Sequence, residues 1–194
     1  MDIQQPLTQI ARDGFFLLRG IVPNDQVGAV RQSALAAAAQ YRQKDAPMHI
    51  AFVPSLLRYD HSAAPYLADS RLLSIVEALL GPHLRISFVS AIINESGNQR
   101  GDWHADWPFN QRNAGHIPAP YPDVLLHLTT LWMLSPFSTE NGGTLIVPQS
   151  HRSPNNPTGA NGIDPHAKHP GEIHVCGNAG DVLLFDSRLW HASA

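Results

Sequence analysis

The sequence predicts a mainly β chain with flanking helices, and an antiparallel sandwich or jelly roll fits it best. Helical periodicity is confined to about residues 1–83, whereas from about residue 84 to 194 short apolar runs alternate with turn residues. The chain has 194 residues, 43% hydrophobic and 15% charged, which is enough for one domain with its own core. We therefore expect a single domain, with a helical part followed by a jelly-roll body.

The first part of the chain predicts one strand and two helices. Residues 15–18 are a short apolar run that follows a glycine and predict the strand. A helix is expected to open at the Pro-Asn pair that ends at Asn24, because apolar side chains then recur on one face. A second helix is capped by Asp69 or Ser70 and stopped by the Gly-Pro pair that follows Leu80. The stretch between the two helices has no clear period and predicts a long loop over residues 44–68.

The body of the chain consists of short apolar runs separated by glycine and asparagine. These runs predict strands at residues 84–94, 103–107, 124–134, 144–147, 172–175, 182–185 and from 189 onward. Two connecting segments, 108–123 and 149–171, are long and rich in proline. Long ordered loops on a β scaffold are usually lids or binding loops, and plain surface excursions are the alternative.

Composition and charge argue against several classes of protein. The formal net charge of -3 argues against a nucleic-acid or anionic-membrane partner. The N-terminus lacks the basic start and apolar run of a secretory signal, and no stretch reaches the roughly 18 apolar residues of a membrane span. The single cysteine, Cys176, rules out an internal disulfide and fits a reducing compartment. We therefore expect a cytoplasmic protein, and the oligomeric state stays open.

The segment GDWHADWPF contains a histidine and an aspartate two positions apart. On a strand, His104 and Asp106 would point to the same face and offer two adjacent metal ligands. His191 is the best third ligand, because it follows a turn-strand-turn unit near the end of the chain. Two histidines and one carboxylate leave about three positions open and suit Fe(II), a chelating cosubstrate and O₂. The alternative is a chance H-x-D tripeptide, since a half-exposed His-Asp pair needs no metal.

Five segments in succession resemble the phytanoyl-CoA dioxygenase family of Fe(II)/2-oxoglutarate oxygenases. They are DGFFLLRGIVPNDQV, LLSIVEALLGPHLRI, WHAD, LWMLSPFSTENGGTLIVPQSH and GDVLLFDSRLWHAS, and they run through most of the chain. The resemblance implies a double-stranded β-helix (jelly roll) that binds Fe(II), 2-oxoglutarate and O₂. It also implies that a C–H bond of a small-molecule substrate is hydroxylated, with release of succinate and CO₂.

The family's motifs assign roles to individual residues. The implied iron ligands are His104, Asp106 and His191. Trp132 matches a tryptophan near 2-oxoglutarate, although it could equally be plain core. Ser193 matches a serine that bonds the far carboxylate of the cosubstrate. Ala91 and Asn94 match the strand that lines the cosubstrate pocket, although Asn94 could equally cap the following turn.

Other residues near these motifs receive lesser roles. His151 lies in the PQSH stretch, where the family has a structural residue, so we expect no metal ligation there. His127 would share a face with Thr129 and is expected to pack or to make a bond behind the ligands. Trp107 and Phe109 are candidates for the substrate wall, together with the loop to Asp123. Halogenating relatives replace the carboxylate ligand by Gly or Ala, so Asp106 favours hydroxylation.

The chain departs from the family pattern after the distal histidine. The family binds the far carboxylate with an arginine about ten residues further on, in a bidentate ion pair. Here the sequence ends at Ala194, and Arg188 precedes the histidine. A jelly roll ended at this point would have an open edge, so we expect a truncated form of a longer protein. The alternative is a short member that binds metal without oxygenase activity.

Two further functions compete with the oxygenase. One is a non-catalytic metal-binding protein of the same fold, which the missing arginine supports. The other is a zinc-dependent hydrolase that uses the same three ligands and an activated water. It would need a nearby base, for which Glu95 and Glu140 are available but unplaced. The sequence does not name the substrate.

Overall fold

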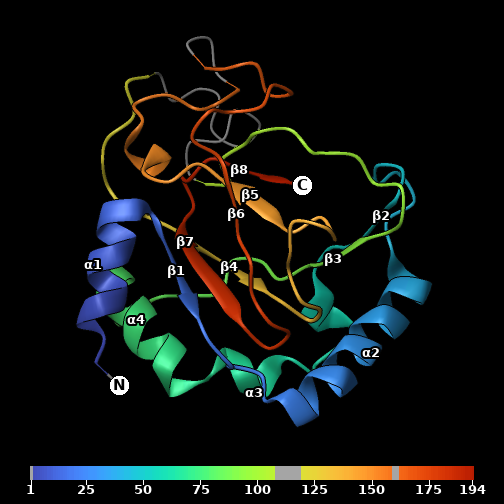
Figure 1. Cartoon of the computed structure of the whole chain (residues 1–194). Coiled ribbons are helices and arrows are strands. Elements are labelled where there is room, and N and C mark those ends of the chain that lie inside the picture. Colours follow the sequence, from blue (N-terminus) through green and yellow to red (C-terminus); the bar gives the residue numbers. More distant parts are fainter. Residues whose placement is uncertain (1, 108–118, 159–161) are drawn as a thin grey trace.

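The computed structural model describes residues 2–107, 119–158 and 162–194 and arranges them as helices packed on antiparallel sheets (Figure 1). In chain order the elements are α1 (Gln4–Asp13), β1 (Phe15–Leu18), α2 (Asn24–Tyr41), β2 (Ile50–Val53), η1 (Leu56–Arg58), α3 (Ala64–Leu67), α4 (Ser70–Leu80), β3 (Ala91–Asn94), β4 (Leu128–Trp132), β5 (Thr144–Ile146), η2 (Ser150–Arg152), β6 (Ile173–His174), β7 (Val182–Asp186) and β8 (His191–Ser193). The predicted strand β1 and the helices α2 and α4 are confirmed.

The helices form where the sequence supplies a cap and an apolar face. The Asp69 side chain accepts a hydrogen bond from the backbone of Arg71 at the start of α4, and Gly81 follows its last turn with a φ of 84°. In α2 the buried face is made of Val30, Ala34, Ala37 and Ala38. In the described part of the chain, no helix combines the length and apolar character needed to cross a membrane.

Two expectations for the first part of the chain were incomplete. Helix α1 was not predicted, because its segment QQPLTQIARD is largely polar and buries only Pro6 and Ile10. The predicted loop over residues 44–68 contains β2, η1 and α3. Strand β2 forms there because β3, which lies much later in the chain, pairs with it antiparallel. A single-sequence pattern does not reveal such a distant partner.

Three antiparallel sheets build the body. The first has the order β1-β7-β4, the second β6-β5-β8, and the third consists of β2 and β3. The register places Phe185 of β7 between Phe15 and Thr129, and Ile146 of β5 opposite His191. These sheets and the flanking helices agree with the predicted jelly-roll class.

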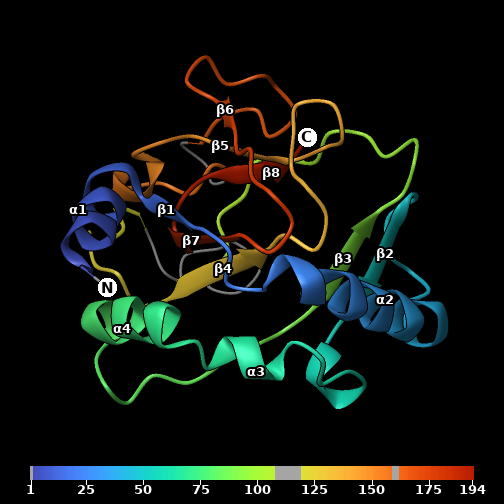
Figure 2. The same cartoon turned by 60° about the horizontal axis from the view of Figure 1, so that its bottom comes forward.

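The two faces of the central sheet have different partners. Val182 and Leu184 pack toward α1 and α4, in a cluster that also contains Ile10, Leu72 and Ile75. Leu183 and Phe185, which alternate with them, pack with Met133, Ile146 and Leu189 toward the second sheet. Figure 2 shows this layering, with α2, α3 and α4 on one side of β4 and β7, and with β5, β6 and β8 on the other. Every side chain of β7 is buried, because both faces are covered.

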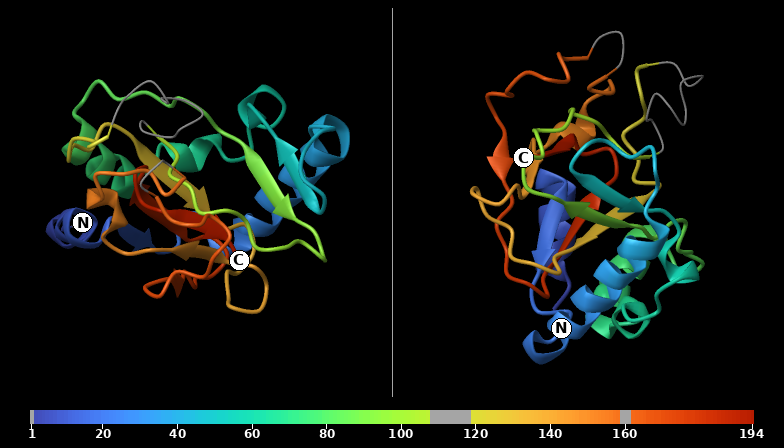
Figure 3. Two further views of the ribbon diagram at one scale, coloured as in Figure 1. Left: turned by 90° about the horizontal axis from the view of Figure 1, so that it is seen from above. Right: turned by 90° about the vertical axis from the view of Figure 1, so that its right-hand side faces the viewer.

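The third sheet stands apart from the central sheet. Strands β2 and β3 pack beside α2 (Figure 3), in a cluster with Ala37, Ala38 and Val53. Among the described residues, β4 pairs only with β7 and β3 pairs only with β2. Ile86, Phe88, Ile92 and Leu126 are exposed, at 56 to 59% of their surface.

Several of the predicted strands are shorter than their apolar runs, as two examples show. In the run 84–94 only β3 is a strand. In the run 103–107 the extended pairing is limited to an isolated bridge between His104 and His191. Local apolar character predicted extended chain in both places, but a ladder also requires a neighbouring strand in register.

Candidate metal centre

Two histidines and an aspartate converge at the end of the second sheet. His104, Asp106 and His191 each offer one ligand atom, and these atoms all lie within 4.8 Å of one another. In the described part of the chain this is the one group of three or more such residues that could hold a metal ion. The three residues are those that the HxD spacing and the late histidine predicted.

The backbone brings the two histidines together. The N–H of His104 donates to the carbonyl oxygen of His191, and the N–H of His191 donates back, both at 3.0 Å. His191 is also held in β8, opposite Ile146 of β5. Because the two histidines form a bonded antiparallel pair, their side chains leave the same face, and their ring centroids lie 4.1 Å apart.

Both imidazoles are oriented by a backbone carbonyl. Nδ1 of His104 lies 2.8 Å from the carbonyl oxygen of Asp102, and Nδ1 of His191 lies 2.9 Å from that of Leu189. A carbonyl only accepts, so each Nδ1 carries a proton and donates it. Each neutral ring then presents the lone pair of Nε2, as is usual for histidines that bind metal.

The carboxylate of Asp106 turns its two oxygens to different partners. Oδ1 lies 3.4 Å from Nε2 of His191 and 3.8 Å from Nε2 of His104. Oδ2 accepts a hydrogen bond of 2.9 Å from the hydroxyl of Thr129. The backbone N–H of Asp106 donates to the carbonyl oxygen of Ser187 at 2.8 Å. Oδ1 is therefore the oxygen that faces both imidazoles.

The centre is buried on one side and open on the other. His191 is only 7% exposed, and the ring of Phe185 lies 4.8 Å from its ring. The side chains of His104 and Asp106 are 42% and 34% exposed. Exchangeable ligands and a substrate would therefore reach the metal from the side of His104 and Asp106.

Burial and mutual charge shift the pKa values of all three residues. Burial, together with the nearby His191, lowers the pKa of His104 to about 4. For Asp106, burial opposes ionisation, but the charge and hydrogen bond of His191, helped by His104 and Thr129, hold its pKa well below the usual range. For His191, burial favours the neutral ring, but Asp106 outweighs it and raises the pKa. The carboxylate of Asp106 thus favours positive charge beside it, which a bound metal ion would supply.

The residues expected to contact 2-oxoglutarate lie in different parts of the fold. Ser193 lies two residues after His191 in β8, on the same face, beside Gly101, whose N–H donates to the Ser193 carbonyl oxygen at 3.0 Å. Ala91 is part of β3 and packs in the α2 cluster. Asn94 ends β3, and its side chain reaches the carbonyl oxygen of Gly142 at 3.5 Å. Of these three residues, only Ser193 lies on β8, the strand that carries His191.

Trp132 does not reach the triad. Its side chain packs on the helical side of the central sheet, with Val182 and Leu184. Its ring N–H donates to the hydroxyl of Thr130, at 3.0 Å. Thr129, which contacts Asp106, points to the opposite face of β4, because adjacent residues of a strand alternate. This packing favours the core alternative for Trp132, and its proximity to 2-oxoglutarate stays a prediction.

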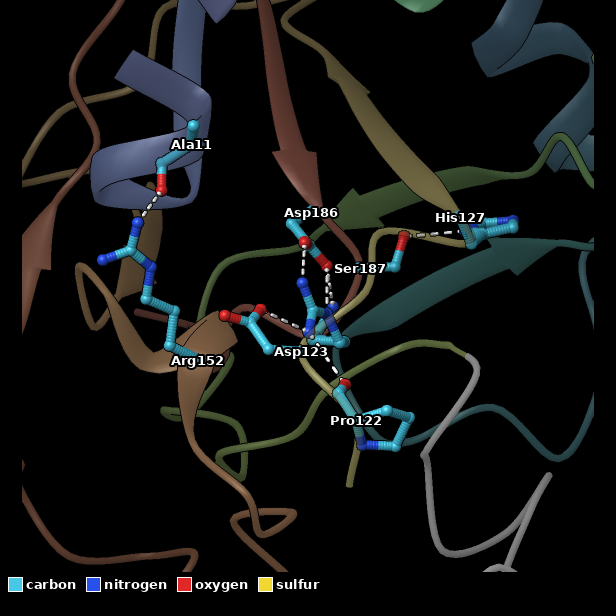
Figure 4. Close-up of polar contacts among 8 residues, drawn as sticks. Ala11, Pro122, Asp123, His127, Arg152, Asp186 and Ser187 are labelled. Atoms are coloured by element: carbon cyan, nitrogen blue, oxygen red, sulfur yellow. Dashed lines mark hydrogen bonds and ion pairs between the residues drawn. The ribbon is translucent and has the colours of Figure 1, made fainter. Parts of the chain in front are cut away.

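The arginine nearest in sequence to the distal histidine is committed elsewhere. Arg188 makes a bidentate contact with Asp186, with distances of 3.0 and 2.6 Å, and a further contact of 3.0 Å with Asp123 (Figure 4). Its guanidinium also donates to the carbonyl oxygen of Pro122. Two carboxylates thus neutralise Arg188, and its role is to tie residues 122 and 123 to the end of β7.

The remaining sequence candidates fall outside the ligand set. His151 is buried in η2 beside Gly14, at 3% exposure, as a structural residue would be. Glu95 forms a surface ion pair with Arg42 at 2.9 Å and is not placed as a base for a hydrolase. Trp107 is 42% exposed, with its ring 6.3 Å from that of His127. Phe109 lies outside the described residues.

Two polar residues of the site were not singled out from the sequence. The hydroxyl groups of Thr129 and Ser187 stand behind Asp106, 2.7 Å from each other. The alternation along the predicted strand 124–134 placed Thr129 and His127 on one face, and both indeed bond to Ser187. No local pattern indicates Ser187, because it becomes a neighbour of Asp106 only after the chain has folded.

Comparison with known proteins agrees with this geometry. The model of the phytanoyl-CoA dioxygenase (PhyH) family matches residues 10–194. "Dioxygenase af480" of Aspergillus fumigatus is 31% identical over 133 residues, which cover 66% of this chain and 37% of that protein. An uncharacterized protein of Mycobacterium tuberculosis, Rv1501, is 26% identical over 145 residues, or 71% of this chain and 47% of its own. The chain thus spans less than half the length of these curated relatives.

Solved structures share the fold. The epimerase SnoN in complex with Fe³⁺, α-ketoglutarate and nogalamycin RO superposes with a TM-score of 0.72 at 20% identity, covering 99% of this chain and 77% of that one. HygX from Streptomyces hygroscopicus with nickel, 2-oxoglutarate and hygromycin B bound gives 0.72 at 18% identity, covering 98% and 80%. At this identity the likeness concerns the fold. Because the family match extends over nearly the whole chain and includes all three converging residues, the protein belongs to the phytanoyl-CoA dioxygenase (PhyH) family.

Proposed function

We propose that this chain is the catalytic domain of an Fe(II)/2-oxoglutarate-dependent dioxygenase that hydroxylates a C–H bond of a small molecule, releasing succinate and CO₂. The observation that carries the proposal is the convergence of two imidazole nitrogens and one carboxylate oxygen within 4.8 Å. A set of two histidines and one carboxylate with open positions is typical of non-haem Fe(II) oxygenases. Family membership and the named dioxygenase relative support the same reaction class.

The residues present fit the metal. Both Nδ1 atoms are bound to backbone carbonyls, so both rings direct Nε2 toward Oδ1 of Asp106, where Fe(II) would bind. The low pKa of Asp106 provides the ionised oxygen that would bind Fe(II). When bound, Fe(II) and 2-oxoglutarate supply, with O₂, the oxidising power for the reaction. The chain's own contribution is to bind, orient and shield these groups.

Ser193 is the residue that we assign to the far carboxylate of 2-oxoglutarate. It follows His191 on the same face of β8, so that its hydroxyl and the metal could be bridged by one cosubstrate molecule. Arg188 is not proposed for this carboxylate, because Asp186 and Asp123 already neutralise it. Trp132 is not proposed either, since its side chain packs on the opposite side of the sheet.

The substrate is proposed as a small organic molecule that approaches from the exposed side of His104 and Asp106. Trp107 is a wall residue on this proposal, because it follows Asp106 closely and exposes 42% of its surface. The related structures named above were solved with nogalamycin RO and with hygromycin B, so this fold admits bulky natural products in those proteins.

The proposal is tested by adding Fe(II) and 2-oxoglutarate without oxygen and recording the visible charge-transfer band of the chelate. The band is expected in the unmodified protein and in His83→Ala, which alters an exposed histidine, and it should disappear in His104→Ala. Metal binding with no band would overturn the oxygenase and favour a non-catalytic metal-binding protein. Ester or amide hydrolysis with Zn²⁺ would instead favour the hydrolase.

A further inference from the structure

A line of polar side chains leads from Asp106 to the surface. The hydroxyl of Thr129 lies 2.9 Å from Asp106 Oδ2 and 2.7 Å from the hydroxyl of Ser187. The same Ser187 hydroxyl lies 2.7 Å from Nδ1 of His127 (Figure 4). Nε2 of His127 lies 2.9 Å from the hydroxyl of Ser87. Four consecutive hydrogen bonds thus connect the carboxylate to an exposed serine.

The carboxylate sets the direction of every bond in this line. An ionised Asp106 only accepts, so Thr129 must use its proton on Oδ2 and accept from Ser187. Ser187 then has no proton left and must accept from His127, which places a hydrogen on Nδ1. A neutral His127 ring has its lone pair on Nε2, where the Ser87 hydroxyl donates. The tautomer of His127 follows from the ionisation of Asp106.

We propose that His127 and Ser187 are positioning residues that hold Asp106 so that only Oδ1 faces the metal. The inference rests on the proposed function. Oδ2 is occupied by Thr129, whose hydroxyl is in turn held by Ser187 and, through it, by His127. A carboxylate so held binds a metal through one oxygen and leaves the adjacent coordination position for an exchangeable ligand.

The backbone reinforces the same three residues. The Ser187 carbonyl oxygen accepts from the N–H of Asp106 at 2.8 Å, and the Ser187 N–H donates to the carbonyl oxygen of His127 at 3.2 Å. Ser187 has no exposed surface, so its hydroxyl depends on these partners in place of water. Without the Nδ1–H of His127, the Ser187 hydroxyl could donate to a group other than Thr129. The Thr129 side chain would then be held less firmly against Asp106.

The test uses Co(II) as a spectroscopic metal, without cosubstrate or substrate. Ser187→Ala and His127→Leu are expected to weaken Co(II) binding about 10- to 100-fold, as is usual for residues that support a metal ligand. Their ligand-field bands should also change in intensity, because a released carboxylate can bind through both oxygens. His127→Asn, whose amide can donate from near the position of Nδ1, should restore affinity and spectrum towards those of the unmodified protein.

Ser33→Ala is the matched control, because Ser33 donates to the buried carboxylate of Asp60 on the helical side at 2.8 Å. It should leave Co(II) affinity unchanged. Unchanged affinity and spectrum in His127→Leu would overturn the inference, as would equal losses in His127→Leu and His127→Asn, which would indicate packing alone. These two variants decide the matter even if Ser187→Ala does not fold. Absence of Co(II) binding by the unmodified protein would overturn the proposed function itself, which separates the two failures.

Discussion

His104 and His191 exchange both of their backbone hydrogen bonds, each N–H donating to the other's carbonyl oxygen at 3.0 Å. This pairing joins the HxD segment to the strand that carries the late histidine. It also fixes which way the two rings point, since paired residues of antiparallel strands leave the same face. The convergence of the two histidines is therefore a consequence of strand pairing, and disturbing the pairing should weaken metal binding.

Metal binding should stabilise the fold. The ligands converge only in the folded chain, so an ion that binds them shifts the unfolding equilibrium by mass action. With free Co(II) at about 100 times its Kd, we expect a gain of about 2.7 kcal/mol, visible as a higher Tm in thermal denaturation. His191→Ala should abolish the gain, and a persistent gain in that variant would indicate that the ion binds elsewhere.

Loss of Arg188 should destabilise the protein strongly. Arg188 is 8% exposed and Asp186 only 2%, so removal of the guanidinium leaves a buried carboxylate without its cation. Arg188→Met is expected to cost about 3–5 kcal/mol in urea unfolding. Arg42→Met removes an arginine from a surface pair with Glu95 and should change little. Equal effects in the two variants would contradict the assignment of Arg188 to a buried ion pair.

Phe185 should couple the core to the metal. It has no exposed surface and lies against the His191 ring at 4.8 Å. Phe185→Ala is expected to cost about 3–5 kcal/mol and also to weaken Co(II) binding, because His191 loses its packing. Leu184→Ala, on the neighbouring position of β7, faces the helices and should destabilise without changing metal affinity. Calorimetric titration of both variants measures the difference.

Ser193 and Trp132 should differ in their effect on the cosubstrate. If Ser193 bonds the far carboxylate, Ser193→Ala removes a hydrogen bond to a charged group, worth about 1.5–3 kcal/mol. The Kd for 2-oxoglutarate, read from the charge-transfer band, should rise accordingly. Trp132→Phe should leave that Kd unchanged, because the indole packs on the helical side of β4. A large effect of Trp132→Phe would restore the family-based expectation for this residue.

His104 should make the metal-free protein less stable as the solution becomes mildly acidic. The pKa of His104 is lowered from 6.5 to about 4, so the folded state resists a proton that the unfolded chain accepts. The stability contributed by the neutral ring is fully present above pH 6.5 and is lost as the pH falls toward 4. His104→Gln should therefore flatten the fall in unfolding free energy over this window. The remaining slope is set by His127 and His151, whose pKa values burial lowers, and by His191, whose raised pKa acts in the opposite direction. If His104→Gln leaves the pH dependence of the unfolding free energy unchanged, the lowered pKa of His104 is contradicted.

Much of this protein follows from local sequence. The HxD spacing and the turn-strand-turn unit before His191 identified the three converging residues, because two-residue alternation and turn chemistry act over a few positions. Asp69 and Gly81 likewise marked the ends of α4. The helical first part and the strand-rich body were visible for the same reason, since apolar periodicity reflects burial in each element.

Other features were decided only by tertiary structure. Strand β2 needed its partner β3, and the side chain of Trp132 was assigned to the helical layer by the register of β4 on β7. Ser187 became the support of Asp106 because the turn after β7 passes behind the HxD segment. The physical reason is the same in each case: a single strand has two equivalent faces and two unsatisfied edges, and only its neighbours determine what each face contacts.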